Sequence, residues 1–290
     1  MYFFILNPCA GRGRSVKIMQ RVIEILEKKR TDFKVIKTEY PGHATLIAKD
    51  AIKNGYKSII AVGGDGTVME VANGMIGETA TMGIIPAGTG NDFIKTVGIP
   101  NDPEIAAEIV LNKRHKKIDI GLANDGRYFL NISSTGFDVE VIKNTEKVKG
   151  FLTGLTAYYT AVFMAMFGYK FKKVILRTKD SVIEKTVLLV AVANGIAYGG
   201  GMKVAPEASI EDGLLNVIIV EKMPRWVIPF QLPKFVKGDH EKIKYIQKFK
   251  CESVTIETEK QELINMDGEI AGTTPVTFSV KSKAINVFAP

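Results

Sequence analysis

Cysteine is scarce in this sequence, with only Cys9 and Cys251 among 290 residues. Two cysteines are too few for a disulfide framework or a zinc site, so we expect free thiols in a reducing compartment. The three histidines are scattered and indicate no catalytic or metal-binding cluster. No secretory signal segment opens the chain, because the apolar run Tyr2–Leu6 is short and leads straight into Asn7 and Pro8. We therefore expect a cytoplasmic protein.

Acidic residues are too few to balance the basic ones, and the formal net charge is +8. A basic chain favours an anionic partner. No nucleic-acid-binding motif is present, so we expect no nucleic acid, but a nucleotide and the acidic lipids of a membrane surface. With 46% hydrophobic residues, the chain can fill the core of one large domain or of two ordinary ones.

Two segments are rich in apolar residues. The run Phe151–Gly168 carries no charge and approaches the length of a membrane span, but its glycine and threonine content favours a buried or groove-lining helix. The segment Met223–Gly238 mixes Trp226 and Phe230 with basic residues, which is typical of a helix at a membrane interface. A core helix with a solvated basic face is the alternative. The first interpretation predicts a peripherally membrane-associated protein.

Segments with strand and helix patterns alternate over the first part of the chain. Strands are expected at 2–6, 33–38, 59–63 and 82–85, and helices at about 16–26, 44–54, 71–75 and 103–111. This alternation predicts a doubly wound parallel α/β sheet with right-handed crossovers over residues 1–122. Over residues 123–283, strand-like runs separated by turn residues predict a mainly antiparallel β domain.

Two glycine-rich stretches follow neighbouring strands of the first domain. Ile59–Thr67 has the sequence IIAVGGDGT and Ile85–Phe93 has the sequence IPAGTGNDF. Open parallel sheets bind ligands at the carboxyl ends of their strands. Gly63, Gly64 and Gly66 should allow backbone angles that other residues avoid, so that N–H groups turn inward and bind phosphate.

The first stretch is not a P-loop, because no Lys-Ser or Lys-Thr pair follows Gly66. A tight strand-to-helix turn, with Asp65 or Thr67 as the N-cap, is the alternative for one glycine cluster alone. Two such clusters at the ends of neighbouring strands favour a phosphate site.

The pair of motifs GGDGT at Gly63–Thr67 and PAGTGNDF at Pro86–Phe93 resembles the catalytic domain of the diacylglycerol kinase and sphingosine kinase family, in its soluble bacterial form. GGDGT alone is also similar to NAD kinases and 6-phosphofructokinases, whereas the pairing with GTGNDF is typical of lipid kinases. The resemblance extends over the whole chain, to VFAP at Val287–Pro290. It implies that the final strand, 284–290, returns to the first domain and that the chain can form a homodimer.

The resemblance implies transfer of the γ-phosphate of ATP, with Mg²⁺, to a hydroxyl group of a membrane lipid. Diacylglycerol is the expected substrate, and phosphatidic acid the product; sphingoid bases and phosphatidylglycerol are alternatives. Two departures keep other functions open. Relatives commonly have Asn at the position of Met69, and some have a lysine in the helix that corresponds to Phe151–Gly168. An NAD kinase-like enzyme and a nucleotide or lipid sensor without turnover are the alternative functions.

The resemblance also implies a nucleotide site built from three loops and nearby side chains. Its expected members are Asn7, Pro8, Cys9, Ala10, Gly11, Arg12, Thr38, Gly63, Gly64, Asp65, Gly66, Thr67, Glu70, Gly88, Thr89, Gly90, Asn91 and Asp92. Arg12 is the candidate for the charged contact with phosphate, and solvated arginines in an ordinary turn are the alternative. Asn91 and Asp92 could instead be helix caps, and Asp119 could join the polar network.

Acidic residues supply the expected chemistry. Asp65 would repel phosphate unless a cation lay between them, so it is assigned to the catalytic Mg²⁺. Phosphorylation of an alcohol also requires a carboxylate that takes up the hydroxyl proton. By resemblance, Glu269 is that base, with Asp267 beside it. An ordinary Asp-Gly hairpin turn at Asp267 and Gly268 is the alternative.

A second ion is implied by the resemblance alone. In bacterial relatives the position of Ser209–Leu214, SIEDGL, binds a structural Mg²⁺. The expected ligands are the side chains of Ser209 and Asp212 and the backbone carbonyl of Leu214, since oxygen ligands suit this ion. From composition alone the segment is a hairpin turn.

Overall fold

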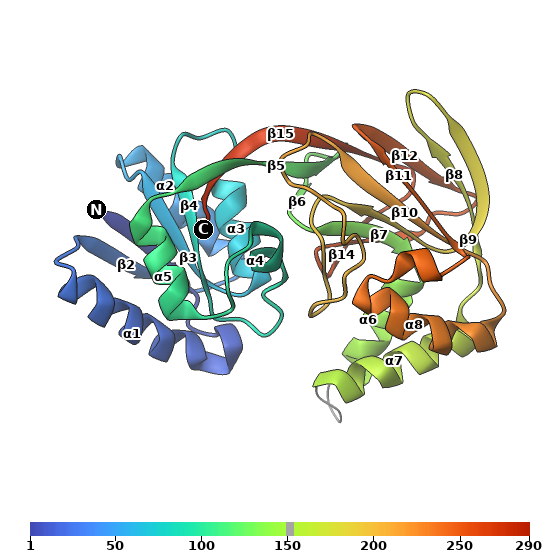
Figure 1. The fold of residues 1–290 in the computed structure, drawn as a ribbon, viewed down its shortest axis with the longest axis horizontal. Coiled ribbons are helices and arrows are strands. Elements are labelled where there is room, and N and C mark those ends of the chain that lie inside the picture. The colour runs from blue at the N-terminus through green and yellow to red at the C-terminus, as the bar shows by residue number, and fades with distance from the viewer. Residues whose placement is uncertain (149–153) are drawn as a thin grey trace.

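The computed structural model describes residues 1–148 and 154–290, and residues 151–153 of the predicted apolar helix lie outside that part. The chain forms two lobes joined by two long strands, β5 (His115–Ala123) and β15 (Val276–Phe288), which arch from one lobe to the other (Figure 1). The first lobe contains a parallel sheet with helices, and the second contains mainly antiparallel strands. The predicted fold class is confirmed.

In the first lobe the strands follow the order β15, β4, β3, β1, β2. The elements are β1 (Tyr2–Leu6), η1 (Ala10–Gly13), α1 (Arg14–Lys28), β2 (Phe33–Lys37), α2 (His43–Lys53), β3 (Ser58–Gly63), α3 (Asp65–Met75), β4 (Thr81–Pro86), α4 (Asp92–Val97) and α5 (Pro103–Asn112). All residues of β1 are buried, as expected for a parallel strand covered on both faces. Helix α1 buries Met19, Val22 and Leu26, which recur on one face and pack on the sheet.

The second lobe contains the remaining strands, three α-helices and two short 3-10 helices of the described chain. These are β6 (Tyr128–Phe129), β7 (Ile132–Gly136), α6 (Phe137–Val148), α7 (Gly154–Gly168), β8 (Lys172–Arg177), β9 (Val182–Ala193), β10 (Leu215–Glu221), η2 (Arg225–Val227), α8 (Ile228–Lys237), η3 (His240–Lys242), β11 (Ile246–Cys251), β12 (Ser253–Thr258), β13 (Leu263–Met266) and β14 (Glu269–Thr273). Helix α6 was not predicted, because apolar and polar residues alternate at 137–141, which is the pattern of a strand.

Strand β15 belongs to both lobes. Its first half pairs antiparallel with β12, and Asn286 and Val287 pair parallel with β4 of the first lobe. Strand β5 runs antiparallel beside it over both halves. The expected final strand at 284–290 is thus the end of a longer strand that begins at Val276, and the two lobes share a continuous sheet.

Helix α7 presents two unlike faces. Ala161, Val162 and Ala165 are buried against the second lobe, whereas Phe163 and Phe167 are 60% and 64% exposed. The helix that was expected to be buried or to line a groove is therefore buried on one face only. Among the described residues, no helix has both the length and the apolarity needed to cross a membrane.

Candidate active site

The three predicted nucleotide loops meet at one edge of the first lobe, where β1, β3 and β4 end side by side. The Asn7 side chain, after β1, donates from Nδ2 to Thr67 Oγ1 at 3.0 Å. The backbone N–H of Ala87, after β4, donates to the carbonyl oxygen of Gly63 at 2.8 Å. A Cβ on Gly11 would overlap the Ala87 carbonyl oxygen, so the first loop also packs tightly on the third. The loops therefore form one connected unit.

The glycines of these loops allow close packing, because they have no Cβ. A Cβ on Gly64 would lie 3.1 Å from the Cα of Gly88, and a Cβ on Gly88 would overlap the Cα of Gly64. A Cβ on Gly63 would overlap the Thr67 side chain. Neither these glycines nor Gly66 has a positive φ. The expectation of unusual backbone angles at GGDG is therefore wrong, and close approach of two backbones explains the motif.

Asp65 links the second loop to the third. Its Oδ1 accepts the backbone N–H groups of Asp92 and Phe93 at 2.7 and 3.0 Å, so Asp65 caps the start of α4. It does not cap its own helix α3, whose N-cap is Gly64. Within residues 1–148 and 154–290, Asp65 Oδ2 has no hydrogen-bond donor.

The electrostatic environment of Asp65 is unfavourable for a bare carboxylate. Burial raises the pKa of Asp65, and the nearby charge of Asp92 raises it further, whereas the two N–H groups and Lys95 lower it. A cation at the free Oδ2 would offset this cost. The carboxylate therefore suits the predicted magnesium role, which stays a prediction.

Asp92 joins the two lobes. Its Oδ1 lies 2.7 Å from the Lys95 ammonium, and its Oδ2 accepts the N–H of Gly200, in the second lobe, at 2.7 Å. One turn further along α4, Thr96 Oγ1 accepts the N–H of Ile196 at 3.0 Å. Asp92 is buried, so these contacts hold the third nucleotide loop against the loop at 196–202.

Asn91 shapes the third loop. It has the left-handed conformation, with φ 48°, and its Oδ1 accepts the N–H of Gly88 at 3.0 Å. Its Nδ2 donates to the Gly88 carbonyl at 3.2 Å and to Asn101 Oδ1 at 2.9 Å. Asn91 is thus engaged within the loop, and Thr89 is left exposed at its tip, where it could contact a ligand.

Glu70 supports the segment that follows Thr38 at the end of β2. Its two carboxylate oxygens accept the N–H groups of Gly42 and Ala44 at 2.9 and 3.1 Å, which caps α2. Both oxygens are therefore occupied by the protein itself. A direct contact between Glu70 and the nucleotide stays a prediction, and the hydrogen bonds favour an indirect role.

The first loop contains two exposed arginines, and one of them, Arg14, donates from Nε to the Gly11 carbonyl oxygen at 3.1 Å. Gly11, Arg12 and Gly13 all have positive φ values, of 58°, 58° and 86°, and form a tight turn before α1. The side chains of Cys9 and Arg12 are exposed, and the Cys9 N–H donates to Asn7 Oδ1 at 3.0 Å. Arg12 has no ion pair among the described residues and could reach a phosphate group.

Asp267 is fixed at a hairpin turn in the second lobe. Asp267 and Gly268 have φ values of 49° and 97° and connect β13 to β14, as the hairpin alternative predicted. Asp267 Oδ2 accepts the N–H of Leu130 at 2.7 Å, and Oδ1 accepts those of Asn131 and Ile132, each at 2.9 Å. These bonds order the residues between β6 and β7.

Asp267 also interacts with the first lobe. Burial and, to a smaller extent, the charge of Asp65 raise the pKa of Asp267 to about 6 against the opposing effect of its three backbone donors. The charge of Asp65 thus acts on an acid that lies about two hundred residues further along the chain. Glu269, at the start of β14, is exposed and accepts no hydrogen bond from the described residues.

The predicted structural ion site has a different occupant. Asp212 Oδ2 lies 2.8 Å from the Lys250 ammonium, and its Oδ1 accepts the N–H of Leu214 at 3.1 Å. Ser209 Oγ accepts a backbone N–H from Glu211 at 3.3 Å. This arrangement does not fit Mg²⁺ unless the Lys250 ammonium leaves. No group of three or more acidic, histidine or cysteine ligands occurs in the described part of the chain.

Asp119 holds the loop at 209–214 to β15. Its Oδ1 accepts the N–H of Lys283 and its Oδ2 that of Gly213, both at 2.7 Å. The side chain is buried in the strand β5 that connects the lobes. Asp119 thus lies in a polar network at the junction between the lobes, and its place in the network of the nucleotide site stays a prediction.

The second lobe contains an apolar pocket that the sequence analysis missed. Its cavity volume is about 300 Å³ and it lies between α6, α8 and strands β9 and β10. Gly268 of the hairpin lies at its lining, as does Asp138. Segments far apart in sequence contribute to it, so no local pattern predicted it.

Asp138 is the buried polar group of this pocket. Its Oδ2 accepts hydrogen bonds from Ser134, from Asn265 Nδ2 at 3.0 Å and from the Tyr198 hydroxyl at 3.3 Å. Its Oδ1 has no hydrogen-bond partner in the part of the chain that the structure describes, and burial raises the pKa of Asp138. An acid three residues after the polar run at 133–135 was the available sequence signal.

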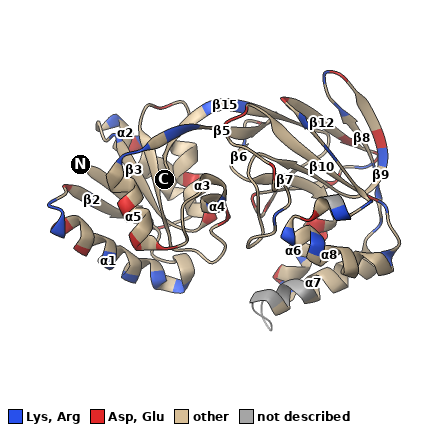
Figure 2. Ribbon diagram, in the orientation of Figure 1, with Lys and Arg blue, Asp and Glu red and all other residues tan. Residues whose placement is uncertain are grey.

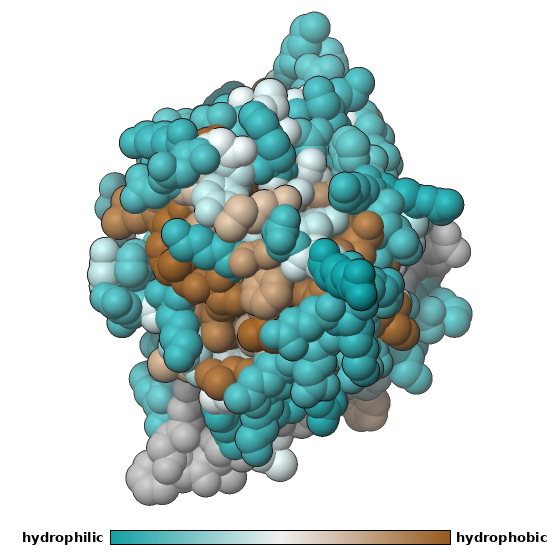
Figure 3. Space-filling model, turned by 90° about the vertical axis from the view of Figure 1, so that its left-hand side faces the viewer, coloured by the Kyte–Doolittle hydropathy of each residue, from teal (hydrophilic) through white to brown (hydrophobic). Residues whose placement is uncertain are grey.

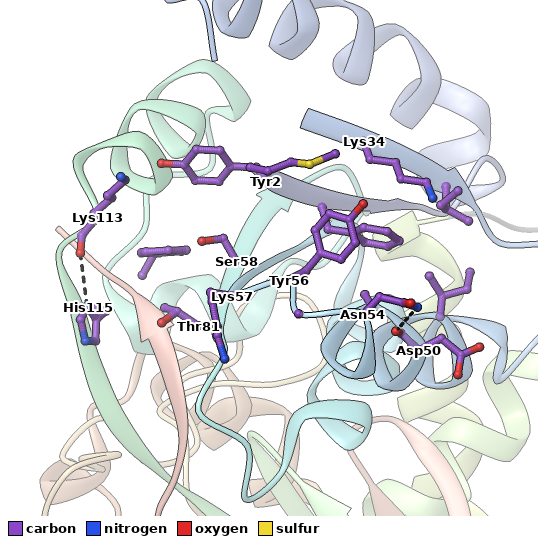
Figure 4. Close-up of a pocket in the computed structure, with 17 residues that line it drawn as sticks. Tyr2, Lys34, Asp50, Asn54, Tyr56, Lys57, Ser58, Thr81, Lys113 and His115 are labelled. Carbon is purple, nitrogen blue, oxygen red and sulfur yellow. Dashed lines mark hydrogen bonds between the residues drawn. The ribbon is translucent and has the colours of Figure 1, made fainter. Parts of the chain in front are cut away.

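A larger hollow lies at the opposite edge of the parallel sheet. Its cavity volume is about 1020 Å³, and Tyr2, Ser58 and Thr81 line it at the amino ends of β1, β3 and β4, together with Lys34 and Lys113 (Figure 4). Figure 3 views this side of the molecule, where apolar residues gather in the middle and hydrophilic ones surround them. The hollow is separate from the glycine loops, and the candidate site does not include it.

A parallel α/β lobe whose joined loops are hydrogen-bonded to a β-rich lobe is the architecture of a two-lobed phosphotransferase. Residues 1–123 match the family described as diacylglycerol kinase catalytic domain, and residues 131–289 match the YegS C-terminal NAD kinase beta sandwich-like domain. The chain is 30% identical to a diacylglycerol kinase of Staphylococcus epidermidis over 99% of this chain and 91% of the relative. A diacylglycerol kinase of Staphylococcus aureus is 31% identical over the same shares.

Solved structures agree with these relatives. The crystal structure of a diacylglycerol kinase from Bacillus anthracis has a TM-score of 0.77 at 25% identity and covers 100% of this chain and 96% of its own. Another chain from that organism has a TM-score of 0.84 at 27% identity, with 100% and 97% covered. The chain belongs to the diacylglycerol kinase family and is a lipid kinase.

Proposed function

We propose that this lipid kinase uses ATP and Mg²⁺ to phosphorylate the free hydroxyl of diacylglycerol, giving phosphatidic acid. The observation that carries the proposal is the chain of hydrogen bonds from Asp65 to the Asp92 N–H and from the Asp92 carboxylate to Gly200, which joins the nucleotide loops to the second lobe. An apolar pocket opens beside the hairpin that holds Asp267. Nucleotide, acid and lipid can therefore converge at one position.

The first lobe would hold the nucleotide. The exposed Arg12 and Thr89 are available to phosphate oxygens from two loops that pack on each other. Asp65 would hold Mg²⁺ through its free Oδ2, directly or through water, with nucleotide oxygens completing the shell. When bound, the ion would neutralise charge that develops on the transferred phosphoryl group.

The second lobe would supply the base and the lipid site. Glu269 has no hydrogen-bond donor among the described residues, so it is free to accept the proton of the lipid hydroxyl. Asp267 positions that hairpin through three backbone hydrogen bonds. An acyl chain would enter the pocket between α6 and α8, which suits a diacyl lipid better than a small polar substrate.

Phosphorylation of mixed micelles tests the proposal. The purified protein is incubated with Mg·ATP and micelles that contain diacylglycerol, sphingosine or phosphatidylglycerol, or with NAD in solution. We expect phosphatidic acid as the main product, strict dependence on Mg²⁺, and a loss of at least about a hundredfold in kcat for Glu269→Gln with unchanged ATP affinity. Glu259→Gln, on a solvated loop with a side chain 72% exposed, is the matched control and should keep full activity.

Three outcomes would contradict the proposal. Phosphorylation of another lipid alone would overturn the substrate, and phosphorylation of NAD alone would support an NAD kinase-like enzyme. Bound nucleotide with no product from any substrate would support a sensor. Full activity of Glu269→Gln would remove Glu269 as the base.

A further inference from the structure

Four exposed aromatic side chains gather at one end of the second lobe. Phe163 and Phe167 on α7 are 60% and 64% exposed, and Trp226 and Phe230 on η2 and α8 are 71% and 70% exposed. Figure 1 shows α7 and α8 at the same end of this lobe. Single exposed aromatic residues are ordinary, but a group of four is typical of a binding surface. We call these four residues the aromatic face.

Hydrogen bonds fix the two parts of the aromatic face to each other. Arg225 donates from Nη1 to the carbonyl oxygen of Phe167 at 3.2 Å and from Nη2 to that of Tyr169 at 2.8 Å. These bonds satisfy carbonyl groups at the end of α7. They hold Trp226, the next residue, beside the end of α7. The rings of Phe163 and Phe167 meet edge to face with centroids 4.9 Å apart.

Basic residues border the aromatic face. The segment Met223–Gly238 contains three basic residues and no acidic one. Lys242 and Lys244 line a shallow groove together with Trp226 and Phe230; of these two lysines, Lys242 pairs with Asp239 at 3.0 Å. Figure 2 shows basic residues on α8 and none on the described part of α7. Aromatic rings bordered by lysines suit the interfacial region of an anionic bilayer.

Helix α8 lies between the aromatic face and the apolar pocket. Phe230 points to solvent, whereas Ile228, Leu232 and Phe235 of the same helix line the pocket. A surface bound at the aromatic face would therefore lie one helix away from the pocket. An exchange of lipid between that surface and the pocket would need only a short path.

We propose that the aromatic face docks on an anionic phospholipid bilayer. The rings of the aromatic face enter the boundary between headgroups and acyl chains, and the bordering lysines contact acidic headgroups. Docking in this orientation brings the apolar pocket next to the bilayer. Only this last step rests on the proposed lipid-kinase function, because binding to a bilayer can be measured without ATP or a phosphorylated product.

Tryptophan fluorescence tests docking directly, because Trp226 is the single tryptophan of the chain. The full-length protein is mixed with vesicles of phosphatidylcholine that contain or lack phosphatidylglycerol. With the anionic vesicles we expect a shift of the emission to shorter wavelength and quenching by brominated acyl chains. With neutral vesicles at physiological salt, both effects should be much weaker.

Variants separate the two parts of the surface. Phe167→Ala combined with Phe230→Ala should weaken vesicle binding by about tenfold or more. Lys234→Gln combined with Lys244→Gln should weaken binding to anionic vesicles and leave the remaining binding to neutral vesicles unchanged. The matched control is Ile105→Ser with Val182→Ser, which removes apolar side chains of 49% and 61% exposure elsewhere and should bind like wild type.

The readouts distinguish this proposal from the proposed function. An unshifted Trp226 emission, or vesicle binding by the double phenylalanine variant equal to wild type, would overturn docking even if the enzyme phosphorylated diacylglycerol. Equal binding to neutral and anionic vesicles would overturn the role of charge. A water-soluble short-chain diacylglycerol should be phosphorylated equally by wild type and the phenylalanine variant. If the variant lost both vesicle binding and phosphorylation of this soluble substrate, the substitutions would have disturbed the pocket, and the loss of binding would not support docking.

Discussion

The carboxylate of Asp92 accepts the backbone N–H of Gly200 across the junction between the two lobes, at 2.7 Å. Its other oxygen pairs with Lys95, which lies on the same helix. The residue thus connects a loop of the nucleotide site to the segment Tyr198–Met202, part of which lines the apolar pocket. A change at Asp92 should affect the use of both substrates.

Asp92→Ala should reduce kcat/KM for the lipid more than it reduces the affinity for ATP. The variant loses the ion pair and leaves the Gly200 N–H without its acceptor, a loss of about 2 kcal/mol for a buried charged hydrogen bond. Steady-state kinetics and denaturant unfolding measure the two effects. Lys95→Met is the comparison, since it removes the ion pair and keeps the contact with Gly200. Equal behaviour of the two variants would show that the contact between lobes has no role.

The packing of Gly64 on Gly88 predicts opposite results at neighbouring glycines. Gly88→Ala places a Cβ on the backbone of Gly64 and should destabilise the fold by roughly 1 to 3 kcal/mol. Gly66→Ala meets no atom within 4 Å and lies in α3, so its stability should be unchanged or slightly higher.

Nucleotide affinity gives these two variants a second measurement. The space beside Gly66 is open and adjoins the predicted phosphate position, so Gly66→Ala should weaken ATP binding without loss of stability. Thermal unfolding and equilibrium binding of ATP separate the two effects. A stable Gly88→Ala, or a Gly66→Ala variant with normal ATP affinity, would contradict this account of the loops.

The position of the nucleotide loops can be predicted from local sequence, whereas the contacts between these loops cannot. Apolar runs that end in glycine predicted loops at one sheet edge, because parallel strands share the direction of their carboxyl ends. The capping of α4 by Asp65 was not predictable in this way, since it depends on how two loops pack. The sequence offered Asp65 or Thr67 as caps of the following helix, and the structure gives that position to Gly64.

The second lobe was harder to predict for the same reason. Most of its strands were expected, and the hairpin of β13 and β14 was expected as an alternative, but helix α6 was not. The pocket depends on contacts such as Asp138 with Tyr198 and Asn265, which come from separate elements. Residue types alone contain no information on such distant pairings, whereas a strand followed by glycine is a local signal.

The raised pKa of Asp267 predicts how stability depends on pH. Its pKa in the folded protein is about 6, above the ordinary value of 3.8, so the folded state holds this proton over a range where the unfolded state has lost it. The contribution to stability is therefore complete below about pH 4 and is lost as the pH rises through about 6. Its full size is at most about 3 kcal/mol.

Asp267→Asn provides the test, because the amide does not titrate. As the pH rises from about 4 to about 7, the unfolding free energy of wild type should fall relative to that of the variant. Denaturant unfolding at a series of pH values measures it. A difference that stays constant, or that changes in the opposite direction, would show that the three backbone donors, and not burial, control this carboxylate.

The ion pair between Asp212 and Lys250 makes a prediction about chelators. An ammonium group 2.8 Å from the Asp212 carboxylate supplies the positive charge that a divalent ion would bring to this loop. Removal of divalent ions with EDTA should therefore leave the Tm of the wild-type protein unchanged.

Lys250→Met should lower the Tm in EDTA, and added Mg²⁺ should restore part of the loss because Asp212, Ser209 and the Leu214 carbonyl are then free to bind it. Lys248→Met, whose partner Glu207 lies outside this loop, is the control and should gain no dependence on Mg²⁺. The opposite result would be a wild-type Tm that falls in EDTA, together with an Asp212→Ala variant whose Tm does not change in EDTA. It would show that an ion displaces Lys250 and occupies the loop.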